Sequence, residues 1–400
     1  MPAQIPPLTI SAYTATCAAA RGRAALLDAL LRRRGGLRLN DFTAAPLATW
    51  IGRVPFVADH PFPSEFAEWE CRNNRLAWMG LQADNFVSQV ATARARYGSN
   101  RVAVVLGTST SSIGATEEGY ERLQPDGQYP PDLRRPIVHT PHSLGDFVQH
   151  ALGLTGVCIT VATACSSSAK VFAQAERLMR LNVADAAVVG GVDTLCGSVL
   201  FGFNSLELVS PEPCRPFDPE RRGITLGEAA GFALLERAAP AQSGAPRLLG
   251  YGETSDAHHM SSPHPDGLGA RIAIRQALSR AGIDAVAIDY INLHGTASRM
   301  NDEIEGRVVS DVFPSTTRAS STKGWTGHAL GAAGILEAVI TLLALENGLV
   351  PGTLNSTSID SAFGPQIALE NEQRELRYAL SHSFGFGGSN CVLAFGRAAA

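Results

Sequence analysis

The order of local patterns along the chain predicts a layered α/β fold. Runs of apolar and β-branched residues at 101–107 and 157–161 alternate with helical stretches at 144–152 and 169–181. Such alternation is typical of sheets that are covered by helices on both faces. The chain has 400 residues, of which 45% are hydrophobic and 18% are charged. This size and composition suit two core-bearing units or one large duplicated domain.

The other elements follow the same alternation in chain order. Helical stretches at 21–34 and 85–97 precede the first strand, and a buried strand at 185–189 runs into two glycines. Beyond them we expect strands at 231–235, 288–293, 378–381 and 391–395, and helices at 270–281 and 328–346.

One segment divides the chain into a longer and a shorter part. The sequence Pro-Ala-Gln-Ser-Gly-Ala-Pro at 240–246 is linker-like, because proline and glycine interrupt regular structure. We therefore expect an N-terminal half, residues 1–245, and a C-terminal half, residues 246–400.

Composition argues against several classes of protein. A formal net charge of −4 gives no overall positive field for nucleic acid, so an acidic partner must meet a local basic patch. The 7 cysteines are scattered without a Cys-x-x-Cys pair, which favours free thiols in a reducing cytoplasm.

We expect neither an export signal nor a membrane span. Pro6 and Pro7 interrupt the N-terminal region before an apolar core forms. The apolar helical stretch 335–345 is shorter than the roughly 18 residues that span a bilayer, and it contains Glu337.

Cys165 lies between the strand 157–161 and the helical stretch 169–181. Because the start of a helix favours an anion, we expect a lowered pKa for Cys165 and a reactive thiolate. The alternative is a buried structural cysteine, which is common for a free thiol. Two distant histidines favour the reactive interpretation.

Both histidines stand among glycine and hydroxyl residues. His294 follows the strand 288–293, and α/β folds bind ligands at the carboxyl ends of their strands. His328 begins the expected helix 328–346, after small residues that allow close backbone approach. A lone histidine at a helix start is usually a cap or surface residue. Two of them together with Cys165 favour a catalytic group.

A glycine-rich turn lies between the last two strands. Its sequence at 383–390, Ser-Phe-Gly-Phe-Gly-Gly-Ser-Asn, suits a mobile turn that moves Phe384 and Phe386 as plugs of a hydrophobic tunnel. A tight structural turn with core aromatics is the alternative.

A cluster of acidic and histidine residues at 256–266 suggests a metal site at first sight. Its spacing fits no compact zinc pattern, and we expect no metal. The residues concerned are Asp256, His258, His259, His264 and Asp266.

Together these motifs resemble the β-ketoacyl-[acyl-carrier-protein] synthases, specifically the decarboxylating class with one cysteine and two histidines. The resemblance covers nearly the whole chain and is strongest from about residue 144 onward. Supporting stretches are Gly-Gly-Val-Asp at 190–193, Cys-Arg-Pro-Phe-Asp at 214–218 and Ser-Asp-Ala-His-His-Met at 255–260. The resemblance implies the thiolase fold, with five layers in the order αβαβα and two similar halves, in a dimer.

The resemblance also implies an acyltransferase that performs a decarboxylative Claisen condensation. Cys165 would take an acyl group from the pantetheine thioester of an acyl carrier protein. A malonyl thioester would then lose CO2, and His294 and His328 would donate to the enolate oxygen. Backbone N–H groups of Cys165 and Phe386 would form the oxyanion hole. No separate cofactor is implied, because the carrier protein holds the substrates on phosphopantetheine.

Further residues match family positions. Lys323 and Glu337 would organise the charges around the site, because buried charges must be paired; a surface salt bridge is the alternative for Lys323. The pantetheine and gate positions are matched by Thr296, Ser298, Phe384 and Phe386.

Arg72 and Arg75 align with a basic segment of the family and would dock the acidic carrier protein. The alternative is plain solvated charge, which contributes little. The implied partners are the carrier protein and a second subunit, either a copy of this chain or a related chain-length factor.

Four residues depart from the family pattern: Ser298 for threonine, Arg299 for proline, His382 for asparagine and Ser168 for a smaller residue. The segment 210–215 is also shorter than in housekeeping fatty-acid enzymes. We therefore expect a dedicated pathway, such as polyene, pigment or polyketide synthesis, with fatty-acid elongation as the alternative.

Related classes fit the motifs less well. A thiolase carries a second cysteine in the C-terminal glycine-rich motif, and enzymes that start chains from coenzyme A thioesters carry asparagine in place of the second histidine. A non-catalytic chain-length factor loses the nucleophile, although this chain could be the active half of such a heterodimer. The sequence leaves acyl chain length, saturation and an aryl starter open.

Overall fold

The computed structural model describes residues 2–237 and 244–397. The strands are β1 Leu8–Cys17, β2 Ala20–Arg21, β3 Arg38–Leu39, β4 Trp50–Gly52, β5 Val102–Gly107, β6 Cys158–Val161, β7 Ala186–Asp193, β8 Leu226–Gly227, β9 Ala229–Arg237, β10 Pro246–Ser255, β11 Tyr290–Asn292, β12 Arg318–Ser320, β13 Leu349–Val350, β14 Glu372–Gln373, β15 Tyr378–Gly385 and β16 Ser389–Arg397. The α-helices are α1 Arg23–Leu31, α2 Arg72–Leu81, α3 Phe86–Tyr97, α4 Ile113–Glu121, α5 Ser143–Ala151, α6 Ser167–Arg180, α7 Gly197–Ser205, α8 Leu268–Ala281, α9 Arg299–Val312, α10 Lys323–Thr326 and α11 Ala333–Asn347.

The central sheet has two halves that come from the two parts of the chain. Its strand order is β12-β11-β15-β16-β10-β1-β9-β7-β5-β6. The halves join where β1 pairs with β10, through Leu8 with Leu248 and Thr9 with Arg247. Residues 238–243 of the linker-like segment lie outside the described residues, and β10 begins at Pro246.

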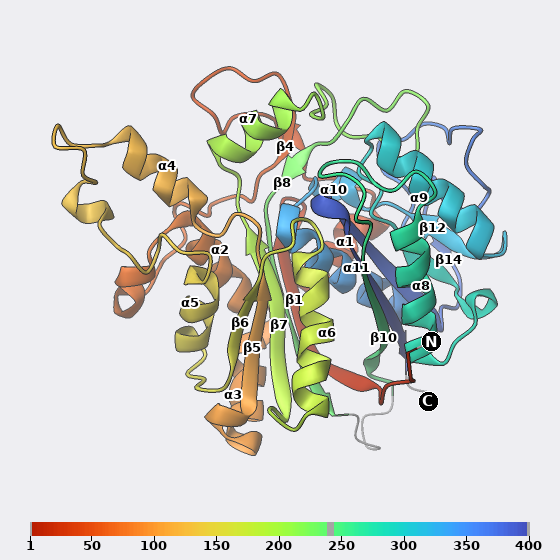
Figure 1. Cartoon of the computed structure of the whole chain (residues 1–400), viewed down its shortest axis with the longest axis horizontal. Coiled ribbons are helices and arrows are strands. Elements are labelled where there is room, and N and C mark those ends of the chain that lie inside the picture. Colours follow the sequence, from red (N-terminus) through yellow and green to blue (C-terminus); the bar gives the residue numbers. More distant parts are fainter. Residues whose placement is uncertain (1, 238–243, 398–400) are drawn as a thin grey trace.

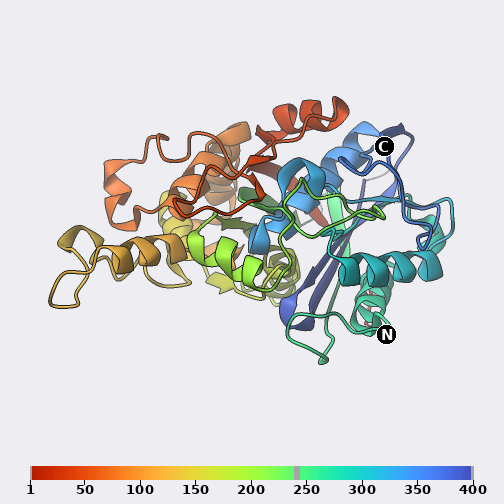
Figure 2. The same ribbon diagram turned by 90° about the horizontal axis from the view of Figure 1, so that it is seen from above.

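Helices form three layers around the halves of the sheet. α6 and α11 pack against each other in the middle, where α6 lies on β5 and β7 while α11 contacts both β15 and β9. α2, α3 and α5 cover the outer face of the N-terminal half, and α8 and α9 cover that of the C-terminal half. Figure 1 shows this order from left to right, and Figure 2 shows α4 and the following loop projecting from one end. The predicted five-layered αβαβα fold is confirmed.

The central helix α11 is apolar all round because protein surrounds it. The stretch Leu330–Asn347 has 18 residues and a mean hydropathy of 1.5, enough in length and composition to cross a membrane, but 89% of it is buried inside the molecule. This stretch is longer than the expected 335–345. A helix that is hydrophobic on every face belongs in a core as well as in a bilayer, and here α6 and the two half-sheets enclose it.

Glycines in β10 let the outer helix approach the sheet. A Cβ on Gly252 would lie 1.8 Å from the carbonyl oxygen of Ala273, and one on Gly250 would lie 2.3 Å from that of Ala277. Both carbonyls belong to α8. Only glycine permits such contact between a strand and a helix backbone.

The segment before α11 differs from the prediction. The expected helix 328–346 begins as a short 3-10 turn at Leu330–Ala332, and the α-helix begins at Ala333. Gly327 with φ 71° and Leu330 with φ 54° turn the chain away from helical geometry. His328 is therefore not a helix-start residue, and its side chain is placed by a turn.

Candidate active site

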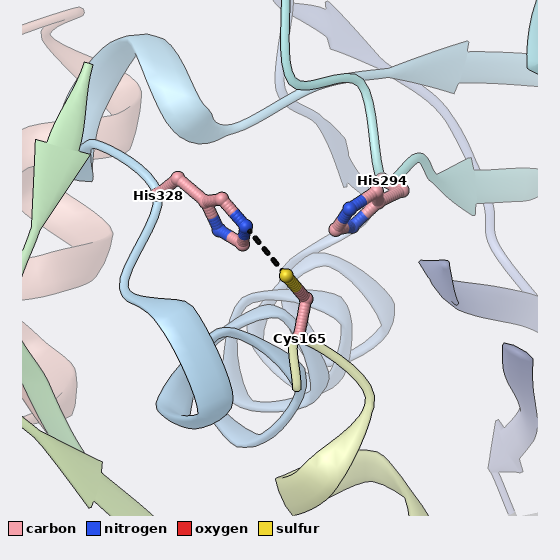
Figure 3. Close-up of side chains that lie close together, drawn as sticks. All are labelled: Cys165, His294 and His328. Carbon is pink, nitrogen blue, oxygen red and sulfur yellow. Dashed lines mark hydrogen bonds between the residues drawn. The ribbon is translucent and has the colours of Figure 1, made fainter. Parts of the chain in front are cut away.

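Cys165 lies in a tight turn between β6 and α6. Ala164 has a φ of 50°, which is unfavourable for a residue with a Cβ. Ser167 holds the turn, because its Oγ accepts from Thr163 N at 2.9 Å and donates to Ala164 O at 2.5 Å. The turn directs the Cys165 side chain toward the two histidines (Figure 3).

The structure brings Cys165, His294 and His328 together. His328 Nε2 lies 3.0 Å from Cys165 Sγ, and the two imidazole rings stand nearly perpendicular with centroids 5.3 Å apart. Figure 3 shows His328 and His294 approaching the sulfur from two different loops. The ligand-type atoms of the three residues lie within 4.8 Å of one another, a distance at which they could also share a metal ion.

Backbone contacts fix both histidines. His294 follows β11, and its N–H donates to Glu305 Oε1 at 2.9 Å. His328 N donates to Thr225 O at 2.7 Å, and Gly227 N donates to His328 O at 3.0 Å. Each histidine is thus tied to a different segment, and the site exists only when those segments are assembled.

The expected lowered pKa of Cys165 is wrong. Burial raises the pKa of its thiol to about 11, against the charge of Lys323 and the backbone amides of Phe386 and Cys165, which all lower it. α6 begins only at Ser167, and removal of the thiol from water outweighs the favourable groups around it.

Both histidines are neutral near pH 7. Burial lowers the pKa of His294 and of His328 well below 6.5, and the positive charge of Lys323 lowers both further. Each ring therefore offers one N–H donor without carrying a charge.

A buried ion pair lies behind His294. Lys323 Nζ contacts Glu337 Oε1 and donates to the carbonyl oxygen of His294 at 2.5 Å, and it lies 3.5 Å from His294 Nδ1. Lys323 is 1% exposed and Glu337 is 3% exposed, so the surface interpretation of Lys323 is wrong. Burial raises the pKa of Glu337 to about 7, although Lys323 opposes this.

The glycine-rich turn packs against the turn that carries Cys165, just before α6. A Cβ on Gly385 would lie 3.1 Å from Cys165 N, a tight contact with backbone that favours glycine there. The ring of Phe384 lies 6.2 Å from that of His294, and the ring of Phe386 stacks on Phe203 with centroids 5.6 Å apart. Phe203 comes from α7, for which the sequence offered no motif beyond a Leu-Phe-Gly-Phe run.

The three residues open into a cavity of about 590 Å³. Thr296 and Ser298 line it, and their hydroxyl oxygens lie 2.9 Å apart. Arg299 and Met300, at the start of α9, also line it and are exposed. The two predicted hydroxyl residues thus line the same cavity as the thiol.

Two family models match consecutive segments of the chain. Residues 76–241 match the family model described as beta-ketoacyl synthase, N-terminal domain, and residues 246–357 match the model of the C-terminal domain. Nodulation protein E of Rhizobium meliloti is 33% identical over 307 residues, which cover 74% of this chain and 75% of that relative. The chain belongs to the β-ketoacyl synthase family.

Other β-ketoacyl synthases match this chain to different extents. The 3-oxoacyl-[acyl-carrier-protein] synthase 2 of Rhizobium meliloti is 41% identical over 261 residues, which cover 60% of this chain and 61% of the relative, less than two thirds of its length. A ketosynthase of Xenorhabdus doucetiae, solved in complex with its chain length factor, has a TM-score of 0.89 and 36% identity, and the match covers 98% of both chains.

Two arginines of this β-ketoacyl synthase lie apart from the cavity. Arg72 contacts Glu228, which is fully buried, and Arg75 donates from Nε to Glu70 Oε1 at 3.0 Å. Both guanidinium groups are thus already paired. Docking of a carrier protein at this position stays a prediction.

The loop 256–266 is hydrogen-bonded to the glycine-rich turn. Asp256 Oδ1 accepts from Asn390 Nδ2 at 2.8 Å, and its Oδ2 accepts from His264 N at 3.1 Å. Among the residues that the structure describes, the one cluster close enough to hold a metal is Cys165 with the two site histidines, and the 256–266 loop is not part of it.

Proposed function

We propose that this member of the family is an active β-ketoacyl-[acyl-carrier-protein] synthase, an acyltransferase that extends an acyl chain with a malonyl unit. The contact between Cys165 Sγ and His328 Nε2 at 3.0 Å carries the proposal, because it joins a nucleophile to a base in the lining of a cavity of about 590 Å³. The substrates would be held on carrier-protein phosphopantetheine, and the mechanism needs no further cofactor.

In the first half-reaction, Cys165 Sγ attacks the carbonyl carbon of the acyl thioester. A bond forms between sulfur and carbon, the thiol proton passes to His328 Nε2, and the pantetheine sulfur leaves and takes that proton. The backbone amides of Cys165 and Phe386 lie beside the sulfur, where they would stabilise the oxyanion of the tetrahedral intermediate.

In the second half-reaction, the malonyl thioester loses its carboxylate as CO2. The electron pair of the broken bond stays on the substrate as an enolate, whose oxygen accepts hydrogen bonds from His294 and His328. For this step the proton of His328 lies on Nε2, the nitrogen that faces the sulfur, rather than on Nδ1 as at the start of the first half-reaction. The enolate carbon then bonds to the acyl carbon, and Cys165 Sγ leaves as a thiolate and takes a proton from water. Neutral imidazoles suit this step because they donate without drawing the substrate carboxylate into an ion pair.

Lys323 and Glu337 would keep the two histidines neutral and in place. The ammonium beside His294 disfavours a second positive charge there, and its hydrogen bond to His294 O fixes the backbone. Thr296 and Ser298 would hold the pantetheine arm, while Phe384 and Phe386 would gate the acyl tunnel.

The likeness to the Xenorhabdus doucetiae ketosynthase supports a chain length factor as partner, because that protein was solved with its own. A dedicated biosynthetic pathway is the first candidate for a chain with such a partner. The likeness to 3-oxoacyl-[acyl-carrier-protein] synthase 2 supports fatty-acid elongation as the second candidate. A homodimer would suit fatty-acid elongation. The free cysteines suit a cytoplasmic location for both candidate functions.

Acylation of Cys165 tests the proposal directly. Incubation with acyl carrier protein thioesters of graded chain length is expected to add the mass of the acyl group to the peptide that contains Cys165. Cys165→Ala abolishes the adduct. A folded wild-type protein that takes no acyl group from any carrier thioester would favour a purely structural subunit. If a metal ion occupied the site instead, acylation would begin only after the protein is treated with a chelator.

The docking prediction needs a variant that spares the fold. Arg72 is unsuitable, because its replacement leaves Glu228 buried without a partner. Arg75→Gln is expected to raise KM for the carrier-bound substrate while leaving the rate with a free acyl thioester unchanged. Equal effects on the two substrates contradict docking at Arg75.

A further inference from the structure

His382 is a buried histidine that the proposed mechanism does not use. It lies in β15 and is 0% exposed. Its Nδ1 lies 3.1 Å from Glu305 Oε1, and its Nε2 has no hydrogen-bond partner among the described residues. Because a carboxylate can only accept, we assign the proton to Nδ1, which then donates to Glu305.

Glu305 connects His382 to the site. From α9 its carboxylate accepts from His294 N at 2.9 Å and from Gly295 N at 2.8 Å. Gly295 has a φ of 37°, so the backbone bends sharply just after the histidine. The direction of the His294 ring therefore depends on a carboxylate that His382 helps to hold.

Phe384 makes a second connection. Residues two apart on a strand point to the same face, and the rings of His382 and Phe384 lie 5.1 Å apart at an angle of 37°. Phe384 in turn lies 6.2 Å from the ring of His294, which lies 5.3 Å from His328. Four rings thus form one continuous series that ends at the thiol.

We propose that His382 is a positioning residue for the decarboxylation step, which sets the orientation of His294 through Glu305 and through Phe384. This inference rests on the proposed function. His328, which takes the thiol proton, is held by Thr225 and Gly227 instead. As long as an aromatic ring at position 382 keeps Phe384 in place, acylation of Cys165 should therefore depend little on the hydrogen bond from His382 to Glu305, whereas enolate formation should depend on that hydrogen bond strongly.

Three variants separate the ring from the hydrogen bond. His382→Phe keeps an aromatic ring beside Phe384 but removes the donor to Glu305. His382→Asn, the residue that the family resemblance places here, keeps an N–H donor without the imidazole. His382→Ala removes both and cannot overpack the site, so it replaces the Phe variant if that protein does not fold.

The readouts are the rate of Cys165 acylation by acyl carrier protein and the rate of CO2 release from malonyl carrier protein, with thermal unfolding as the control. His382→Phe is expected to slow CO2 release by about tenfold to hundredfold, since a small misplacement of a catalytic group has effects of this size, while acylation stays within about threefold. His382→Asn is expected to restore CO2 release most of the way.

Each outcome bears on one proposal. Equal losses in both half-reactions, or no recovery in His382→Asn, would overturn the positioning role of His382 and leave the proposed function intact. Absence of acylation and CO2 release in the wild-type protein would instead refute the proposed function.

Discussion

At Cys165 two effects act on one thiol in opposite directions. The ammonium of Lys323 and nearby backbone amides favour the thiolate, and burial favours the neutral thiol and dominates. The protein at rest then holds a protonated cysteine 3.0 Å from a neutral histidine. In the proposed mechanism, activation takes place during attack on the thioester, when His328 receives the proton.

The pH dependence of alkylation reports this state. With a thiol pKa of about 11, the thiolate fraction of Cys165 increases with pH up to that value. The rate of its modification by iodoacetamide is therefore expected to rise about tenfold per pH unit from about pH 7 to about pH 10. Mass spectrometry of the peptide that contains Cys165 measures the rate, with Cys165→Ser as the control. A plateau near neutral pH would contradict a raised pKa.

Motifs in the sequence predict the residues of the site better than their electrostatics. Cys165, His294 and His328 each stand in a short segment of glycine and hydroxyl residues, which the sequence displays directly. The direction of the thiol pKa depends on how much protein covers it, and no local pattern shows this. No local pattern shows the role of Phe203 either, because its contact with Phe386 joins two helical turns that are distant in the chain.

The ion pair of Lys323 and Glu337 couples two elements near the site. Lys323 begins the short helix α10, and Glu337 lies in the first turns of α11. Both side chains are buried, so neither charge has water to replace a lost partner. The pair therefore fixes the turn that carries His328, which lies between the two helices.

A double-mutant cycle tests this coupling. Glu337→Leu is expected to lower the free energy of unfolding by about 3–5 kcal/mol, because it leaves the charge of Lys323 buried without its partner. Lys323→Met is expected to cost less, because Glu337, whose pKa burial already raises to about 7, then takes up a proton. The double variant, with no charge left, is expected to be more stable than either single variant. Urea unfolding measures all four proteins, and additive losses would show that the side chains act independently.

Some elements were visible in the sequence and others were not. The strands β5, β6 and β7 are short apolar runs, and the helices α5, α6 and α8 are continuous stretches, so local pattern is enough to predict them. β1 and β10 were missed because their stability comes from long-range antiparallel pairing with β9 and β16. The start of α11 was misplaced because Gly327 and Leu330 adopt positive φ values, which depend on contacts with β8.

The two halves of the molecule share one helical layer. α11 belongs to the C-terminal half but contacts β9 of the N-terminal half, and α6 packs against it from the other part of the chain. The predicted boundary at 245 and 246 therefore separates segments of sequence that share a hydrophobic core. Their cores are continuous, because residues of both halves lie in one buried cluster.

Calorimetry tests whether the halves are independent. Since they share a core, heating is expected to produce a single cooperative transition, with equal calorimetric and van't Hoff enthalpies if unfolding is reversible. Two resolved transitions would mean that residues 1–245 and 246–400 behave as separate folding units.

The position of α11 also constrains how the chain is made. The strand β9 ends at Arg237 and α11 ends at Asn347, so on the ribosome the N-terminal half is complete well before its covering helix exists. At 5–20 residues per second this delay is roughly 5–20 s. During that time the inner face of the N-terminal sheet and α6 lack the apolar helix α11 that covers them. A chaperone that binds exposed hydrophobic surfaces is therefore expected to bind the nascent chain.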